Sequence, residues 1–129
     1  MWGARGLLHV FAPSAIDSVV AGLADPSWRV REMCAKVVRA HEVGAAAAAA
    51  VTLCQDEVPR VRVAAVRALA VVGEAVDADA VRRLVDDVER PVVSAARRAL
   101  HDMSSRLDRD LVNPDKARMG IRRDQFKRT

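Results

Sequence analysis

Apolar and polar positions along this chain follow a pattern that recurs with a fixed period. Asp25, Asp56 and Asp87 occupy one column of the alignment, so the period is 31, and an apolar segment follows each of them. Within each segment the apolar positions fall at i, i+4, i+7 and i+8, which together form one face of an α-helix. The columns are Val30, Val61 and Val92; Cys34, Ala65 and Ala96; Val37, Ala68 and Ala99; and Val38, Leu69 and Leu100. Each period therefore predicts a helix that starts soon after its aspartate.

A second set of apolar columns precedes the aspartates and predicts another helix in each period. Its columns are Val19, Ala50 and Val81, and Leu23, Cys54 and Val85. The alanine-rich run from 44 to 53 lies in this register, and alanine favours helix strongly while letting neighbouring helices approach closely. Each unit is thus predicted to be a pair of helices joined near the aspartate.

Polar residues and prolines mark where these helices start. Ser14 and Asp79 stand where a side-chain oxygen can accept a hydrogen bond from a free backbone N–H group in the first turn of a helix, so they are predicted N-caps. Asp25, Asp56 and Asp87 are each predicted to cap the helix that follows. Pro26, Pro59 and Pro91 fall in the turn or the first helical turn, where a missing N–H is harmless.

Composition agrees with an all-α fold. The chain of 129 residues is 51% hydrophobic and 29% charged, but only 3% aromatic, so its core must be built from small aliphatic side chains. Such a core suits closely packed helices better than a β-sheet. We predict one repeat domain, 1–113, with units at about 14–44, 45–75 and 76–105, followed by a tail, 114–129.

Both ends of the domain carry apolar segments that are predicted to cover it. The N-terminal cap, 1–13, contains Trp2, Leu7, Leu8, Val10 and Phe11. At the other end, Ser104–Val112 is predicted to extend the last helix, with Leu107 and Leu111 at i, i+4 closing the stack. An incomplete cap exposes an apolar edge, which favours weak homo-oligomers.

The stretches "DPSWRVR" and "DEVPRVR", each followed by a helix of small residues, resemble HEAT-like repeats, and most closely the short repeats of bilin-lyase-type proteins. The resemblance covers about Ser14 to His101 and implies a right-handed α-solenoid of about three two-helix repeats. It also implies a structural ladder of aspartates and arginines between neighbouring units, with Asp25 paired with Arg31, Asp56 paired with Arg62, and Asp87 at the third position. Val93 takes the arginine position in the third unit, as happens in terminal repeats.

Other basic residues form a band across the predicted second helices. Arg29 and Lys36 are seven residues apart and share one helix face, away from the apolar columns. Such a wall of second helices is where the resemblance implies that partners bind. The predicted partner-binding residues are Trp28, Arg29, Lys36, Arg39, Arg60, Arg67 and Arg98. The alternatives are that Trp28 only covers the turn after Pro26 and that the band is a solvated face with local ion pairs, such as Glu32 with Lys36.

The net charge of +4 resides in the tail, because residues 1–113 carry equal numbers of acidic and basic side chains. A basic tail favours contact with nucleic acid, an acidic partner or an anionic membrane. Its predicted contact residues are Lys116, Arg118, Arg122, Arg123, Lys127 and Arg128.

No pattern for catalysis or metal binding is present in the sequence. His41–Glu42 is one isolated pair, which cannot supply a full ligand shell, so no metal, cofactor or enzymatic activity is expected. The segment Leu7–Ala12 is too short for the apolar core of a signal peptide, and no apolar run is long enough to span a membrane. Cys34 and Cys54 are predicted to be buried free thiols, which fits a cytoplasmic location.

Two classes of function follow. The leading hypothesis is a non-enzymatic interaction module that binds a protein or an acidic peptide through its second-helix wall. The alternative is nucleic-acid binding through the basic band and tail, for which affinity falls steeply with salt. Outside these two classes, a bilin-lyase-like chaperone or lyase is a further alternative, supported by the repeat alone.

Overall fold

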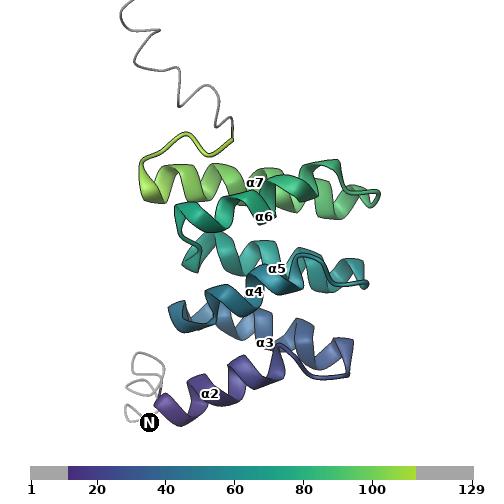
Figure 1. Ribbon diagram of the computed structural model, residues 1–129, viewed down its shortest axis with the longest axis vertical. Coiled ribbons are helices and arrows are strands. Elements are labelled where there is room, and N and C mark those ends of the chain that lie inside the picture. Colours follow the sequence, from purple (N-terminus) through teal and green to yellow (C-terminus); the bar gives the residue numbers. More distant parts are fainter. Residues whose placement is uncertain (1–11, 113–129) are drawn as a thin grey trace, which may run out of the picture.

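The computed structural model describes residues 12–112 and is a stack of paired helices, as the repeat pattern predicts (Figure 1). Within this range all regular structure is helical. The α-helices are α2 (Pro13–Gly22), α3 (Trp28–His41), α4 (Ala47–Leu53), α5 (Pro59–Val72), α6 (Ala78–Arg83) and α7 (Arg90–Leu107). Three 3₁₀ turns adjoin the short helices: η1 (Gly44–Ala46), η2 (Ala75–Asp77) and η3 (Leu84–Asp86). The predicted all-α solenoid is confirmed.

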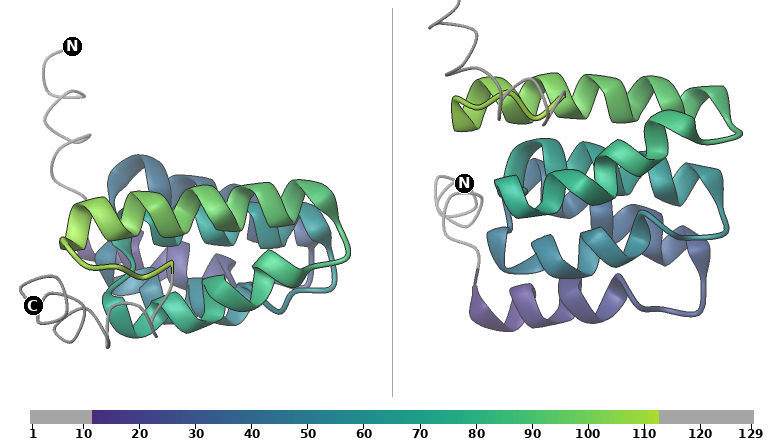
Figure 2. Two further views of the ribbon diagram at one scale, coloured as in Figure 1. Left: turned by 90° about the horizontal axis from the view of Figure 1, so that it is seen from above. Right: turned by 45° about the horizontal axis from the view of Figure 1, so that its top comes forward.

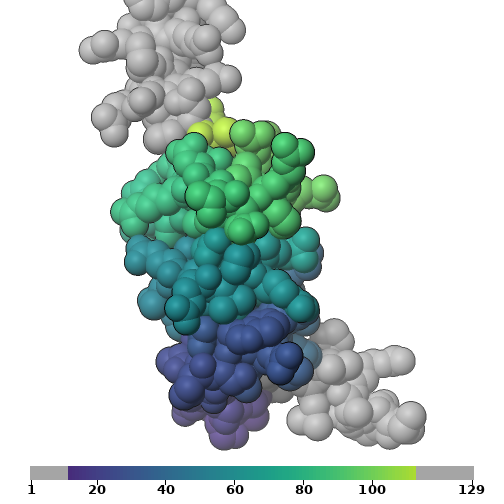
Figure 3. Space-filling model, turned by 90° about the vertical axis from the view of Figure 1, so that its right-hand side faces the viewer, coloured from purple at the N-terminus to yellow at the C-terminus, as the bar shows by residue number. Residues whose placement is uncertain are grey.

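The helices are arranged in two layers along the long axis of the molecule (Figure 1 and Figure 2). One layer holds the longer helices α3, α5 and α7, which begin at Trp28, Pro59 and Arg90 and so keep the period of the aspartates. The other layer holds α2, α4 and α6. In the space-filling view the colours succeed one another along the stack, so each unit contacts chiefly the units next to it in sequence (Figure 3).

The core runs between the layers and is most complete around α5, which packs between α3 and α7. Val61, Ala65 and Leu69 of α5 are fully buried, and so is Val92 of α7. Val30 holds the same register position in the first unit but is 38% exposed. Among the described residues no unit precedes the first, so this end of the apolar column has no neighbour to bury it.

Two predicted helix caps are wrong. The first helix starts two residues earlier than a Ser14 cap requires, at Pro13, and Ala12 rather than Ser14 is its N-cap. Asp79 lies inside α6, while the preceding turn is closed by Asp77, whose carboxylate accepts the N–H of Glu74 at 2.8 Å. A proline that fits the first helical position moves the start of α2, and a 3₁₀ turn before α6 moves the cap to an earlier acid.

The three repeated aspartates lie in the turns, but two residues before the N-cap positions. The carboxylate oxygen Oδ1 of each accepts the backbone N–H of the residue two further on: Ser27, Val58 and Glu89, at 2.8, 2.9 and 2.9 Å. This arrangement is an Asx turn, which shapes the loop rather than satisfying the first turn of the helix. The expectation that they cap the helices directly is therefore wrong.

The C-terminal end is closed differently from the prediction. The last helix ends at Leu107, because Asp108 adopts a left-handed conformation (φ 53°) and reverses the chain. Leu111 is buried, but off the helix: its N–H donates to Ser104 Oγ, and its carbonyl accepts from Arg82 Nη1. The predicted N-terminal cap, 1–13, lies almost wholly outside the described residues, and so does the tail. No helix in the described range has the length and apolar character needed to cross a membrane.

Candidate functional site

Successive units are joined by an arginine that reaches forward to the next aspartate. Arg31 of α3 donates from Nε to Asp56 Oδ2 at 2.7 Å and from Nη2 to Asp56 Oδ1 at 3.3 Å. Its Nη1 donates to the backbone carbonyls of Asp25 and Pro26 in its own turn. The guanidinium thus ties the loop of its own unit to the carboxylate of the following unit, with both side chains largely buried. The predicted pairing of Arg31 with Asp25 and of Arg62 with Asp56 is wrong, because each arginine meets only the backbone carbonyl of the aspartate in its own unit.

Arg62 repeats this contact one period later. Its Nη2 donates to Asp87 Oδ1 at 3.0 Å, and its Nη1 donates to the carbonyl of Asp56 at 2.7 Å. Nε lies 2.9 Å from Asp87 Oδ2, an ion-pair distance, but its buried N–H does not point at an acceptor. Burial by itself raises the pKa of Asp87, but the N–H of Glu89 and the Arg62 guanidinium outweigh it, so the pKa lies below its ordinary value.

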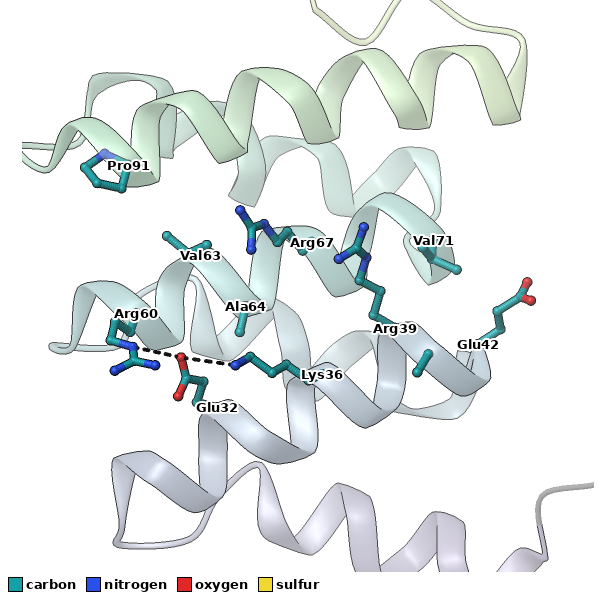
Figure 4. A pocket seen from close by; sticks show the side chains of 11 residues that line it. Glu32, Lys36, Arg39, Glu42, Arg60, Val63, Ala64, Arg67, Val71 and Pro91 are labelled. Atoms are coloured by element: carbon teal, nitrogen blue, oxygen red, sulfur yellow. Dashed lines mark hydrogen bonds and ion pairs between the residues drawn. The ribbon is translucent and has the colours of Figure 1, made fainter. Parts of the chain in front are cut away.

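One exposed side of α3, α5 and α7 forms a groove. Two adjoining hollows of about 940 and 910 Å³ overlap on this wall of longer helices, and they share Arg39, Val63, Arg67 and Pro91 among their lining residues. Small apolar side chains form much of the lining: Ala40, Val63, Ala64, Ala70, Val71, Ala95 and Ala99. We call this continuous depression the groove (Figure 4). It lies on the second-helix wall.

At one end of the groove, two positive side chains are paired with a carboxylate of the groove itself. Glu32 of α3 accepts from Arg60 Nε of α5 at 3.0 Å, and Lys36 Nζ lies 3.7 Å from the same carboxylate oxygen (Figure 4). The Glu32 side chain is only 13% exposed, whereas those of Lys36 and Arg60 are 62% and 67% exposed. These two predicted binding residues therefore already share an acidic partner.

Three other arginines in the groove have no such partner among residues 12–112. Arg39, Arg67 and Arg98 are exposed, one on each helix of the wall, and none makes a hydrogen bond or ion pair with the residues that the structure describes. Figure 4 shows the guanidinium groups of Arg39 and Arg67 over the groove, with no dashed line to a carboxylate. We call these three residues the groove arginines.

Trp28 and Arg29, also predicted to bind a partner, do not line the groove. The guanidinium carbon of Arg29 lies 5.2 Å from the centroid of the Trp28 ring, and that of Arg60 lies 5.4 Å from it. At such distances the ring face attracts the cations, so Trp28 helps to hold Arg60 at the groove end. The indole itself is half-buried against the core.

Arg106 also lines the groove, although the sequence does not predict it as a partner-binding residue. It donates to the backbone carbonyls of Ala70 and Gly73 at the C-terminal end of α5, where helix carbonyls lack internal partners. The sequence signal for this role is that Arg106 stands in the last turn of α7, where a cation can bind carbonyls at a helix end. Its position in the sequence does not indicate which helix end it contacts.

The other predicted features divide between outside and inside the described range. The tail residues Lys116, Arg118, Arg122, Arg123, Lys127 and Arg128 lie outside it. Within residues 12–112 no three His, Cys, Asp or Glu side chains are grouped so as to hold a metal ion.

Cys34 is half-buried and Cys54 buried, both as free thiols. Burial, followed by the charge of Asp77, raises the pKa of Cys54 to about 12, and burial followed by Asp25 raises that of Cys34.

The comparison with known families matches the helices that build the groove. The family model described as HEAT repeats matches residues 16–101, from α2 into α7, which is two thirds of the chain. The predicted HEAT-like resemblance is thereby confirmed. No curated protein matches the chain.

Proposed function

This chain belongs to the HEAT-repeat family, and from that premise we propose that it is a non-enzymatic module that binds a protein segment in the groove on α3, α5 and α7. Repeats of this family generally mediate protein–protein interactions, and family members are typically scaffolds. The proposal places this activity in the cytoplasm, in keeping with two free thiols in the described range.

The observation that carries the proposal is the composition of the groove. Its lining combines small apolar side chains with exposed cations that have no partner in the described residues. Binding sites commonly have this form, in which apolar lining contributes affinity and a few polar groups fix orientation. Trp28 supports the site indirectly, since its ring contacts Arg60, which lines the groove.

Nucleic-acid binding is supported less well than protein binding. Glu32 neutralises two of the cations in the band, and Glu42 and Asp102 add further negative charge to the same lining. A phosphate backbone is attracted by a continuous row of cations and gains nothing from an alanine and valine lining.

A peptide-display selection against the whole chain tests the proposal. Selected peptides are labelled, and their affinities are measured by fluorescence anisotropy for the wild type and for Ala40→Trp. Ala40 is exposed in the groove on α3, so an indole there fills the space that a bound segment needs. We expect Ala40→Trp to weaken binding by about tenfold or more, since a filled pocket cannot accept an anchoring side chain.

The matched control is Ala48→Trp. Ala48 is an exposed alanine on α4, in the other layer of helices, and it does not line the groove. It receives the same change in size and hydrophobicity, and affinity should stay at the wild-type value. Selected peptides that bind Ala40→Trp as well as the wild type would overturn the proposal, as would binders that are lost only in Ala48→Trp.

A further inference from the structure

Resting on the proposed function, we propose that the occupant of the groove is an acidic amphipathic helix. Its carboxylates pair with the groove arginines, Arg39, Arg67 and Arg98, and its apolar side chains lie on the alanine and valine lining between them. Binding of a protein segment in the groove does not by itself require that the segment be acidic or helical.

The charge of the groove arginines is complementary to that of an acidic segment. Each long helix contributes to the groove lining one exposed arginine whose guanidinium has no anionic partner within the described range. Like charges gathered on one surface repel one another, so anions that bind between them are favoured. Arginine also presents a planar set of donors that matches the two oxygens of a carboxylate.

The surface between these cations is lined by small apolar side chains. Ala64 and Val71 of α5 line the groove beside Arg67, and Ala95 and Ala99 of α7 line it beside Arg98. Small side chains leave room for a partner helix to approach closely. A volume of about 940 Å³ is in the range that accommodates several apolar side chains.

The expected spacing of the groove arginines matches that of acidic residues along one face of a helix. Packed helices lie about 8–10 Å apart, so arginines on successive helices of the wall present charges separated by a similar distance. A helix rises about 1.5 Å per residue, so acidic side chains seven residues apart are separated by about 10 Å on one face. Apolar residues three and four positions after each acid fall on that face between them.

The charges that line the groove favour a peptide over an oligonucleotide. Glu42 and Asp102 line the groove together with the groove arginines, so an evenly charged phosphate backbone meets repulsion as well as attraction. A helix with separated acids can place its carboxylates at the arginines and its neutral side chains elsewhere.

The test uses a designed helical peptide of about 18 residues, with Glu every seven positions and Leu three and four positions after each Glu. A second peptide carries Gln in place of every Glu, and a third carries the same residues in scrambled order. Binding to the full chain is measured by anisotropy at about 50 and about 200 mM salt. We expect the acidic peptide to bind about tenfold more tightly than either comparison peptide, since it alone aligns carboxylates with all three arginines.

Charge reversal identifies the residues involved. The variant Arg39→Glu/Arg67→Glu/Arg98→Glu should lose at least about tenfold in affinity for the acidic peptide. The control is Arg83→Glu/Arg90→Glu/Arg97→Glu, which changes net charge equally at three exposed arginines outside the groove. It should retain wild-type affinity, and circular dichroism establishes that both variants are folded.

A single substitution should strengthen binding. Glu32→Gln removes the carboxylate that engages Arg60 and Lys36, so two further cations of the groove become available to the peptide. We expect affinity for the acidic peptide to rise about threefold and affinity for the Gln peptide to stay unchanged. A loss of structure cannot produce such a gain.

The outcomes separate this inference from the proposed function. Groove-dependent binding of selected peptides that lack acidic residues, with no preference for the acidic design, overturns the acidic helix and leaves protein binding standing. Failure of every selected peptide to depend on Ala40 overturns both. Tighter binding of a single-stranded oligonucleotide than of the acidic peptide, lost in the groove triple variant, overturns both in favour of nucleic acid.

Discussion

Arg31 and Asp56 belong to consecutive units of the solenoid, and Arg31 Nε lies 2.7 Å from Asp56 Oδ2. Arg62 and Asp87 have the same separation in sequence and make the same contact one unit later. The joint between neighbouring units is therefore polar and specific, in addition to the apolar packing of the helices.

Replacing Arg31 by Met should destabilise the fold by about 2 kcal/mol, because two carboxylate oxygens and two backbone carbonyls lose their donor in a largely buried place. Urea unfolding followed by circular dichroism measures the change. Arg39→Met, on the same helix but exposed and without a partner in the described range, should cost less than about 0.5 kcal/mol. Equal costs for the two variants would contradict a structural role for the Arg31 contacts.

The Asp87 carboxylate should contribute stability that depends on pH. Its pKa is lower in the folded protein than the ordinary value near 4, so its contribution is complete above about pH 4 and is lost as pH falls through the folded pKa. The difference in unfolding free energy between the wild type and Asp87→Asn should be constant from about pH 5 to 7 and shrink below about pH 4. A difference that grows on acidification would show that the Arg62 contact does not favour the charged carboxylate.

Equivalent valines in different units should differ in their effect on stability. Val61 is fully buried, and Val61→Ala should cost about 2 kcal/mol by leaving a small cavity. Val30 is 38% exposed in the same register, and Val30→Ala should cost less than about 1 kcal/mol. Both substitutions gain the same helix propensity, so the comparison isolates burial. Equal costs in urea unfolding would indicate that the first unit is as fully packed as the second.

The two thiols should differ in reactivity in the folded protein. Cys54 is buried with a pKa of about 12, so only about one molecule in 10⁴ carries its thiolate at pH 8. Single-cysteine variants, Cys34→Ser and Cys54→Ser, treated with a disulfide reagent at pH 8 report each thiol separately. Cys34, half-buried, should react well ahead of Cys54, which should react at the rate of unfolding. Faster modification of Cys54 would contradict its burial.

The helix pairs and their period could be predicted from the sequence because one spacing relates buried positions such as Val61 and Val92. Features that depend on only a few atoms could not be predicted in this way. Ser14 and Asp79 have residue types suited to capping, but a proline and a 3₁₀ turn place the helix starts elsewhere. Periodicity also assigns Val30 and Val61 the same role, although burial depends on which neighbours each unit has.

The wall that carries the groove could likewise be predicted, but not its detailed electrostatics. A column of basic residues does not reveal that Glu32 reaches across to Arg60 of the next helix, since that contact depends on how the helices are spaced. Their positions in the sequence also assign Trp28 and Arg29 to the partner-binding residues, although neither side chain lines the groove. Arg106 enters it from the far end of α7, where no column marks the position.

The two equivalent joints, Arg31 with Asp56 and Arg62 with Asp87, allow this architecture to change its length. A chain lacking the segment 56–86 places Asp87 where Asp56 stood, at the same separation from Arg31, so the one remaining joint keeps its two partners. A duplicated period likewise adds an arginine and an aspartate in matching places. In such an array stability grows in nearly equal steps with each unit. Modules of this kind can be gained or lost by duplication and deletion without redesigning the contacts that hold their neighbours.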